Sequence, residues 1–117
     1  LFLLLEEVDK KYLKSRFGSD DGSLYKCTAN LTWIGPNVKT YENLMCNGSP
    51  CYEAKTSAAD NYSPLVSLIA AINLPLNNSF SVVLPKIFDV DLFLRTFAFE
   101  VLTGNWDGLR GSNNFYL

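Results

Sequence analysis

The residues of this 117-residue chain that could carry out chemistry lie close together near its C-terminus, in a stretch rich in glycine and asparagine at residues 104–114. Asn113 and Asn114 follow Asp107 after six and seven positions, so the carboxylate and the amide oxygens can converge on one loop. A carboxylate can accept a proton from a hydroxyl nucleophile, and an amide oxygen can ligate Mg²⁺. Arg110 could neutralise a phosphate group. The stretch therefore has residue types suited to phosphate chemistry.

A helix, an aspartate, an asparagine and a strand follow one another in the same order in the catalytic loop of protein kinases. A simpler interpretation is also open, because Asp and Asn among glycines are ordinary turn residues and Trp106 could cap the core. The glycines at 104, 108 and 111 are no phosphate-binding fingerprint, since they follow a helix and no Gly-Lys-Ser/Thr closes them.

Two elements must position this stretch. The first is a predicted helix at residues 89–103, capped by Asp89, in which apolar residues recur at helical spacing: Val90, Phe93, Leu94, Phe97, Ala98 and Val101. Because further apolar residues lie on its other faces, we expect this helix to be buried on more than one side. Gly104 ends the helix, and residues 115–117 begin a strand.

At the N-terminus, residues 1–8 are predicted to form a buried strand that ends in a polar turn. A short helix follows at residues 9–17 and stops at Gly18. Its lysines form a solvated face rather than a binding patch. If this helix begins before residue 9, Glu6–Lys10 and Glu7–Lys11 are at the i,i+4 spacing of helical ion pairs.

The middle of the chain is rich in loops, with short strands possible at residues 24–27 and 30–34. Another helix is predicted to begin with Ser63 as its N-cap and Pro64 in the first helical position, and to end near Asn73. The chain as a whole is predicted to be α+β.

Composition excludes several kinds of function. Apolar residues make up 48% of the chain, which is enough for the core of one domain. Ten basic residues against 12 acidic ones leave no electrostatic footprint for nucleic acid. Histidine is absent, which removes Ser–His and Cys–His nucleophile pairs and imidazole-based zinc sites. No run of apolar residues approaches the length of a membrane span.

Cysteines and glycosylation sequons bear on the compartment. Cys46 and Cys51 bracket a turn-forming tetrapeptide and could form a disulfide, although metal binding and buried free thiols are alternatives. Cys27 is then a free thiol or half of a bridge to another segment. Four Asn-x-Ser/Thr sequons occur, at Asn30, Asn47, Asn61 and Asn77, and proline directly follows two of them. Together these features favour an extracellular or secretory setting.

Two segments carry a resemblance to a known family. The C-terminal segment DVDLFLRTFAFEVLTGNWDGLRGSNNFYL and the N-terminal segment LLLEEVDKKYLKSRFGSDDGSLYK resemble the CotH kinase family, the spore-coat protein H type of bacteria and fungi. They flank a variable middle, so the resemblance covers the whole chain.

The resemblance implies part of an atypical protein-kinase-like fold, with a hinge, large-lobe helices and a catalytic loop, that transfers phosphate from ATP to Ser or Thr of a spore-coat or surface protein. Asp107 matches the catalytic base, and Asn114, with Asn113 as second choice, matches the ligand of Mg²⁺. Glu6 and Glu7 correspond to the hinge beside the adenine. Arg110 could contact phosphate.

Residues 1–117 are expected to be a partial domain, cut at both ends. The resemblance also implies a Trp-Asp-x-Asp segment that supplies the main Mg²⁺ carboxylate, and a phosphate-contacting lysine on small-lobe strands; neither is in this sequence. We therefore expect negligible kinase activity from these 117 residues alone.

A second hypothesis comes from fungal relatives that resemble cell-surface proteins acting in adhesion or invasion. The sequons, the Cys46–Cys51 turn and the polar residues 27–62 suit a surface module that binds a host-cell receptor without kinase activity. Under either hypothesis the protein is expected to be secreted or located at the cell surface or spore coat.

Overall fold

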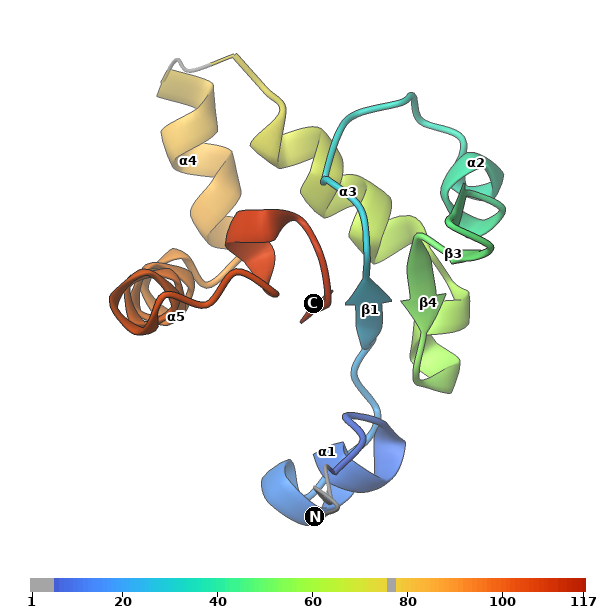
Figure 1. The fold of residues 1–117 in the computed structure, drawn as a ribbon. Coiled ribbons are helices and arrows are strands. Elements are labelled where there is room, and N and C mark those ends of the chain that lie inside the picture. Colours follow the sequence, from blue (N-terminus) through green and yellow to red (C-terminus); the bar gives the residue numbers. More distant parts are fainter. Residues whose placement is uncertain (1–5, 76–77) are drawn as a thin grey trace.

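The computed structural model describes residues 6–75 and 78–117, and its centre is a three-stranded antiparallel sheet (Figure 1). Strand β1 (Tyr25–Cys27) lies between β4 (Tyr52–Ala54) and β5 (Phe115–Tyr116). In this register Cys27 stands opposite both Tyr52 and Phe115. The strands predicted at residues 24–27 and from residue 115 are confirmed. The strand predicted for residues 1–5 lies outside the described residues.

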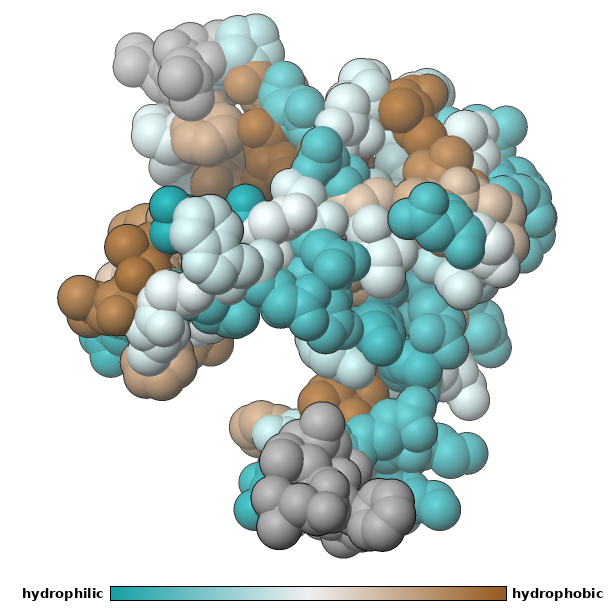
Figure 2. Space-filling view, in the orientation of Figure 1, coloured by the Kyte–Doolittle hydropathy of each residue, from teal (hydrophilic) through white to brown (hydrophobic). Residues whose placement is uncertain are grey.

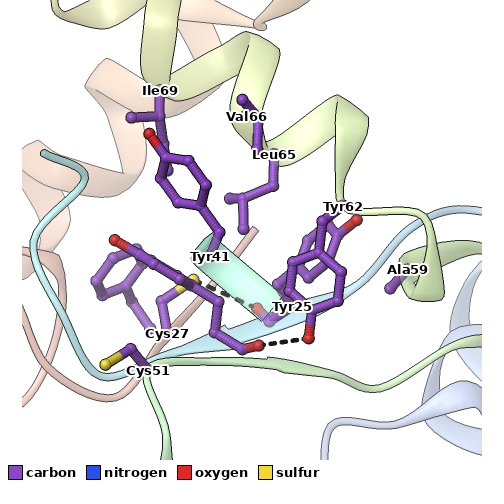
Figure 3. Packing of buried hydrophobic residues seen from close by; sticks show 11 residues of the cluster. Tyr25, Cys27, Tyr41, Cys51, Ala59, Tyr62, Leu65, Val66 and Ile69 are labelled. Atoms are coloured by element: carbon purple, nitrogen blue, oxygen red, sulfur yellow. Dashed lines mark hydrogen bonds between the residues drawn. The ribbon is translucent and has the colours of Figure 1, made fainter. Parts of the chain in front are cut away.

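Side chains from one face of this sheet pack against helix α3 (Ser63–Ile72) and helix α2 (Val38–Glu42) (Figure 3). Four tyrosines in this cluster donate their hydroxyls to main-chain carbonyls of neighbouring segments. Tyr52, for example, donates to the Asn30 carbonyl at 2.5 Å. Burial raises the pKa of Tyr52 to about 12. The described residues thus form the mixed α+β structure that the sequence predicts.

The first helix, α1 (Lys10–Phe17), ends where predicted and begins one residue later than predicted. Asp9 caps it by accepting hydrogen bonds from the next turn, and Gly18 ends it at a φ of 80°. The condition for the i,i+4 pairs Glu6–Lys10 and Glu7–Lys11, an early start of this helix, is not met, because the helix begins at Lys10 and both glutamates precede it. Their actual partners lie further away in the sequence: Arg16 at 2.9 Å for Glu6 and Lys55 at 3.2 Å for Glu7.

Helix α3 ends as predicted at Asn73, but it begins one residue earlier than predicted. Ser63 is its first residue rather than its N-cap, because Tyr62 occupies the cap position. The Asn61 side chain accepts a hydrogen bond from the Ser63 amide at 3.1 Å and so performs the capping that was expected of Ser63.

Residues 28–37 contain no strand, contrary to the prediction for residues 30–34. Both neighbours of β1 begin opposite Cys27, β4 at Tyr52 and β5 at Phe115, so neither strand runs beside the residues that follow Cys27. Its main-chain groups bond to side chains instead: Tyr52 donates to the Asn30 carbonyl, and the Ile34 amide donates to the Tyr41 hydroxyl at 3.1 Å.

A disulfide closes a small hairpin after α2. Strands β2 (Met45–Cys46) and β3 (Ser49–Pro50) pair with each other, and Cys46 is bonded to Cys51 with a Cα–Cα distance of 5.0 Å. The predicted pairing is confirmed. Cys27 is a buried free thiol, and burial raises its pKa to about 12.

Two helices form the arm of the molecule that leads to the C-terminus, α4 (Asn78–Ile87) and α5 (Val90–Thr103) (Figure 1). Helix α4, which the sequence did not predict, packs against α3. Helix α5 has the predicted bounds, with its Asp89 cap accepting from the Leu92 amide at 2.9 Å. No residue of α5 is buried by the described residues, contrary to expectation. Hydrophobic side chains are therefore exposed over α5 (Figure 2). Leu102, near its C-terminal end, is 86% exposed.

Within the described residues, no helix is both long enough and apolar enough to cross a membrane.

Candidate functional site

The end of helix α5 fixes the start of the loop that holds Asp107. Gly104 has a φ of 66°, which reverses the chain, and the Asn105 amide then bonds to the Glu100 carbonyl at 2.9 Å. The Asn105 side chain bridges the turn, because it donates to the Glu100 carboxylate at 3.4 Å and accepts from the Asp107 amide at 3.2 Å. Asp107 is thereby attached to the helix through both main-chain and side-chain contacts.

Asp107, Asn113 and Asn114 meet at one exposed point, as their spacing predicts. Asn113 donates its side-chain amide to Asp107 Oδ1 at 2.8 Å, and Asn114 donates to Asp107 Oδ2 at 3.0 Å. Each carboxylate oxygen thus accepts one amide hydrogen bond. Because a carboxylate has about four acceptor positions, about two remain open to a ligand. All three side chains belong to exposed residues, so a substrate can reach them.

Two glycines allow the loop to close tightly enough for this convergence. The Gly108 carbonyl accepts from the amides of Gly111 and Asn113, both at 3.1 Å, around the short 3₁₀ turn η2 (Leu109–Gly111). A Cβ on Gly111 would overlap the Trp106 carbonyl oxygen, and a Cβ on Gly108 would overlap the Glu100 carboxylate. The turn interpretation of this loop is therefore confirmed, and the turn itself brings the polar groups together. The assignment of these groups to a catalytic site stays a prediction.

The second anchor of the loop is the sheet. Asn114 has a φ of 50°, in the left-handed region that asparagine tolerates, and leads directly into β5. Phe115, the next residue, is buried opposite Cys27. Asp107 is thus positioned by α5 and Asn114 by the sheet, so the contact between them joins two rigid elements.

Trp106 and Arg110 form an exposed pair beside Asp107. The Arg110 guanidinium lies over the Trp106 ring, 4.7 Å from its centre. Trp106 is 73% exposed, so the prediction that it caps the core is wrong. Among the described residues Arg110 has no ion-pair partner, which leaves its charge available to an anion.

The structure does not bring Glu6 and Glu7 to this loop. Glu6 pairs with Arg16 of α1, and Glu7 pairs with Lys55, which also binds Glu53 at 2.8 Å. The hydrogen bond that Lys55 donates to Glu53, with a smaller contribution from the one it donates to Glu7, raises the pKa of Lys55. These contacts attach the segment before α1 to the chain after β4. Its assignment to a nucleotide-binding hinge stays a prediction.

The donor set of the loop suits a hard divalent cation. Both asparagines direct their amide nitrogens at Asp107, so their carbonyl oxygens point elsewhere and are free to accept or to ligate. Mg²⁺ prefers such oxygen ligands, usually one or two from protein together with water and phosphate. No group of three or more acidic or cysteine side chains that could hold a metal occurs in the described part of the chain.

Two apolar grooves flank α5 and β5, with volumes of about 510 and 500 Å³. The 510 Å³ groove reaches the site through Asn114 and Glu100, while Asp107 lines neither groove. Their walls are mainly aromatic and aliphatic, from residues such as Phe93, Phe97 and Phe115. The polar side chains of the loop therefore lie at the rim of the 510 Å³ groove.

Sequence reasoning missed the supporting role of Glu100 and Asn105. An available signal was the asparagine two positions before Asp107, a spacing at which an Asn side chain commonly accepts from the main-chain amide.

Comparison with known proteins gives one match. The family described as CotH kinase protein matches residues 1–117, the whole chain. No curated protein and no solved structure matches the chain.

Proposed function

Because the chain belongs to the CotH kinase protein family, we propose that it supplies the hinge-to-catalytic-loop part of an ATP-dependent protein Ser/Thr phosphotransferase with an atypical kinase-like fold. The observation that carries the proposal is the Asp107 carboxylate held between the amides of Asn113 and Asn114, immediately after a helix and before a strand. This is the arrangement a catalytic loop needs, with a base fixed beside a metal-ligating amide.

Asp107 acts as the base in this proposal. A Ser or Thr hydroxyl of the protein substrate would donate to one of the open acceptor positions on the carboxylate and pass its proton there as its oxygen bonds to the γ-phosphorus of ATP. The bond from that phosphorus to the oxygen that bridges it to the β-phosphate would break, and ADP would leave. The two amide hydrogen bonds hold the carboxylate in one orientation, so the hydroxyl is aligned when it binds. Phosphoryl transfer depends mostly on such positioning and on neutralising charge.

The cofactors implied are ATP and Mg²⁺. Asn114, with Asn113 as the second choice, offers a carbonyl oxygen to the metal, and Arg110 offers its charge to a phosphate. When bound, Mg²⁺ neutralises the charge of the phosphates. The adenine would lie near Glu6 and Glu7, whose ion pairs with Arg16 and Lys55 fix the segment before α1.

The test uses the full-length protein with Mg–ATP and measures phosphate incorporated into Ser or Thr. Asp107→Asn keeps the size of the side chain and removes the base, so transfer should fall about 10²–10⁴-fold. Asp91→Asn is the matched control, because Asp91 is an exposed carboxylate on α5 whose only described ion pair is with Arg95. Transfer by Asp107→Asn equal to that of the Asp91 control would overturn the proposal.

A second candidate function is binding at a cell surface without catalysis. The disulfide-closed hairpin favours it, because Cys46–Cys51 holds exposed residues 47–50 in one conformation at the surface, as a recognition loop requires. Its partner would be a host-cell receptor. Receptor binding that survives Asp107→Ala, in a protein with no micromolar affinity for Mg–ATP, would favour this candidate. For both candidates we propose a secreted, cell-surface or spore-coat location.

A further inference from the structure

The Asn-x-Ser/Thr sequons differ sharply in the structural settings of their asparagines. Three of the four acceptor residues, Asn30, Asn47 and Asn61, belong to the described part of the chain, and Asn77 lies outside it. All three are exposed, so exposure alone does not distinguish them. The distinction lies in the residues after each asparagine and in the hydrogen bonds that its side chain already makes.

Asn47 occupies the tight turn of the disulfide-closed hairpin. It has a φ of 51°, in the left-handed region, and its sequon ends at Ser49, directly before Pro50. Proline restricts the conformation of the residue before it and removes a main-chain donor. Because Cys46 and Cys51 enclose the whole sequon, it cannot extend into an enzyme's active site once the disulfide forms.

The side chain of Asn61 already makes a hydrogen bond at the start of α3. Its Oδ1 atom accepts a hydrogen bond from the Ser63 amide, and Tyr62, the middle residue of the sequon, is buried in the core. Pro64 follows Ser63 directly. Two features therefore oppose glycosylation of Asn61: the proline that restricts Ser63, and the burial of the central residue of the sequon, which keeps this segment packed against the core.

Asn30 has none of these restrictions. Its sequon, Asn30-Leu31-Thr32, lies in the irregular segment after β1, and Trp33 rather than proline follows it. Asn30 and Thr32 are exposed, and no side-chain hydrogen bond of Asn30 occurs among the described residues. Only main-chain groups of the segment are used: the carbonyls of Asn30 and Leu31 accept from Tyr52 and Asn73. The side-chain amide is therefore free to react while the backbone around it is held in place.

The Cys46–Cys51 disulfide supplies the second, independent observation, because disulfides persist in the oxidising compartments where N-glycosylation also takes place. We propose that Asn30 is the preferred N-glycosylation site of the three described sequons. The donor is an oligosaccharide linked to a lipid through a diphosphate, supplied by the secreting cell. A bond forms between Asn30 Nδ2 and the anomeric carbon of the first sugar, the bond from that carbon to the phosphate oxygen breaks, the lipid diphosphate leaves, and one amide proton passes to a base of the transferase.

The position of Asn30 also explains why a glycan is tolerated there. Asn30 lines the 500 Å³ groove but is itself exposed, so a bulky attached group extends into solvent without displacing a packed side chain. Asp107 does not line this groove, so the inference is independent of the proposed phosphotransfer.

The test maps glycan occupancy on the full-length protein secreted from eukaryotic cells. Enzymatic release of N-glycans converts each modified asparagine to aspartate, which peptide mass spectrometry then locates. We expect high occupancy at Asn30 and low occupancy at Asn47 and Asn61. Secreted protein with Asn30 unmodified, or with Asn47 or Asn61 more fully occupied, would overturn the proposal.

Variants translated in vitro with microsomes test the sequon without requiring a stable fold. Asn30→Gln and Thr32→Ala should each remove the same glycan-dependent mobility shift, whereas Thr32→Ser, which keeps a hydroxyl, should retain it. Pro64→Ala should raise occupancy at Asn61, because it removes the restriction on Ser63. A mobility shift that persists unchanged in Asn30→Gln would contradict the assignment.

Discussion

Alanine substitutions at glycines of the candidate loop should cost stability in a graded order that the structure dictates. In Gly111→Ala, the new Cβ would overlap the Trp106 carbonyl oxygen, a main-chain atom that can move only if the loop moves. Overlap of this kind in a packed structure costs about 1–3 kcal/mol. In Gly108→Ala the overlap is with the Glu100 and Asn105 side chains, which can turn away, so the cost should be about 1 kcal/mol for the hydrogen bond lost between them.

Gly22→Ala is the matched control, because an added Cβ there meets nothing within 4 Å and the residue has no positive φ. It should leave stability unchanged or raise it by about 0.4–1 kcal/mol through the unfolded state. Urea unfolding of the three variants, followed by tryptophan fluorescence, gives the free energy of unfolding of each. Because Trp106 lies in the loop, its emission in the native state also reports whether Gly111→Ala has moved it. Gly111→Ala as stable as Gly22→Ala, with unchanged native emission, would refute the described loop geometry.

Three further predictions concern the core. Ile69→Ala, at a fully buried position of α3, should lower the free energy of unfolding by about 2–5 kcal/mol in urea titrations, and a smaller loss would mean that α3 does not pack on the sheet. Reduction of the Cys46–Cys51 disulfide, which closes a loop with a sequence separation of only 5, should cost about 2 kcal/mol; the Cys46→Ser/Cys51→Ser double variant should match the reduced protein and be insensitive to reductant. Burial raises the pKa of Cys27 and of Tyr52 to about 12 from ordinary values of 9.0 and 10.0, so the native state holds these protons more tightly and stability should fall as the pH rises from about 9 to 12. Cys27→Ala should flatten the first part of that fall, and an unchanged slope would show that the thiol is not buried in solution.

The helices that the sequence predicted well are those with a capping or terminating residue at their ends. Asp89 and Gly104 cap the two ends of α5 as predicted, and Gly18 ends α1 as predicted. Asp9, predicted as the first residue of α1, is its N-cap instead. The spacing of the polar residues in residues 104–114 also predicted their convergence, because the loop is short and its glycines permit tight turns.

Helices α2 and α4 could not be predicted from the same signals. Helix α4 contains Pro85 and two adjacent β-branched valines, which disfavour a helix locally, and packing against α3 overrides that preference. Helix α2 is only five residues long, too short for a periodic pattern to show.

The expected strand at residues 30–34 failed for a topological reason. Apolar and β-branched residues favour a strand there, but both strands beside β1 begin opposite Cys27 and do not extend along residues 30–34. Tyrosine hydroxyls bond to the Asn30 carbonyl and the Ile34 amide instead. Contacts between residues far apart in the sequence could not be predicted either, such as the ion pairs of Glu6 with Arg16 and of Glu7 with Lys55.

The central claim is that the Asp107 carboxylate, held by Asn113 and Asn114, is the base of a phosphotransferase. The most direct measurement is the rate of phosphate transfer from Mg–ATP to Ser or Thr by the full-length protein, with Asp107→Asn compared with Asp91→Asn. The account predicts transfer by the wild-type protein and by Asp91→Asn at similar rates, with a loss of about 10²–10⁴-fold in Asp107→Asn. Equal rates for all three proteins would contradict it.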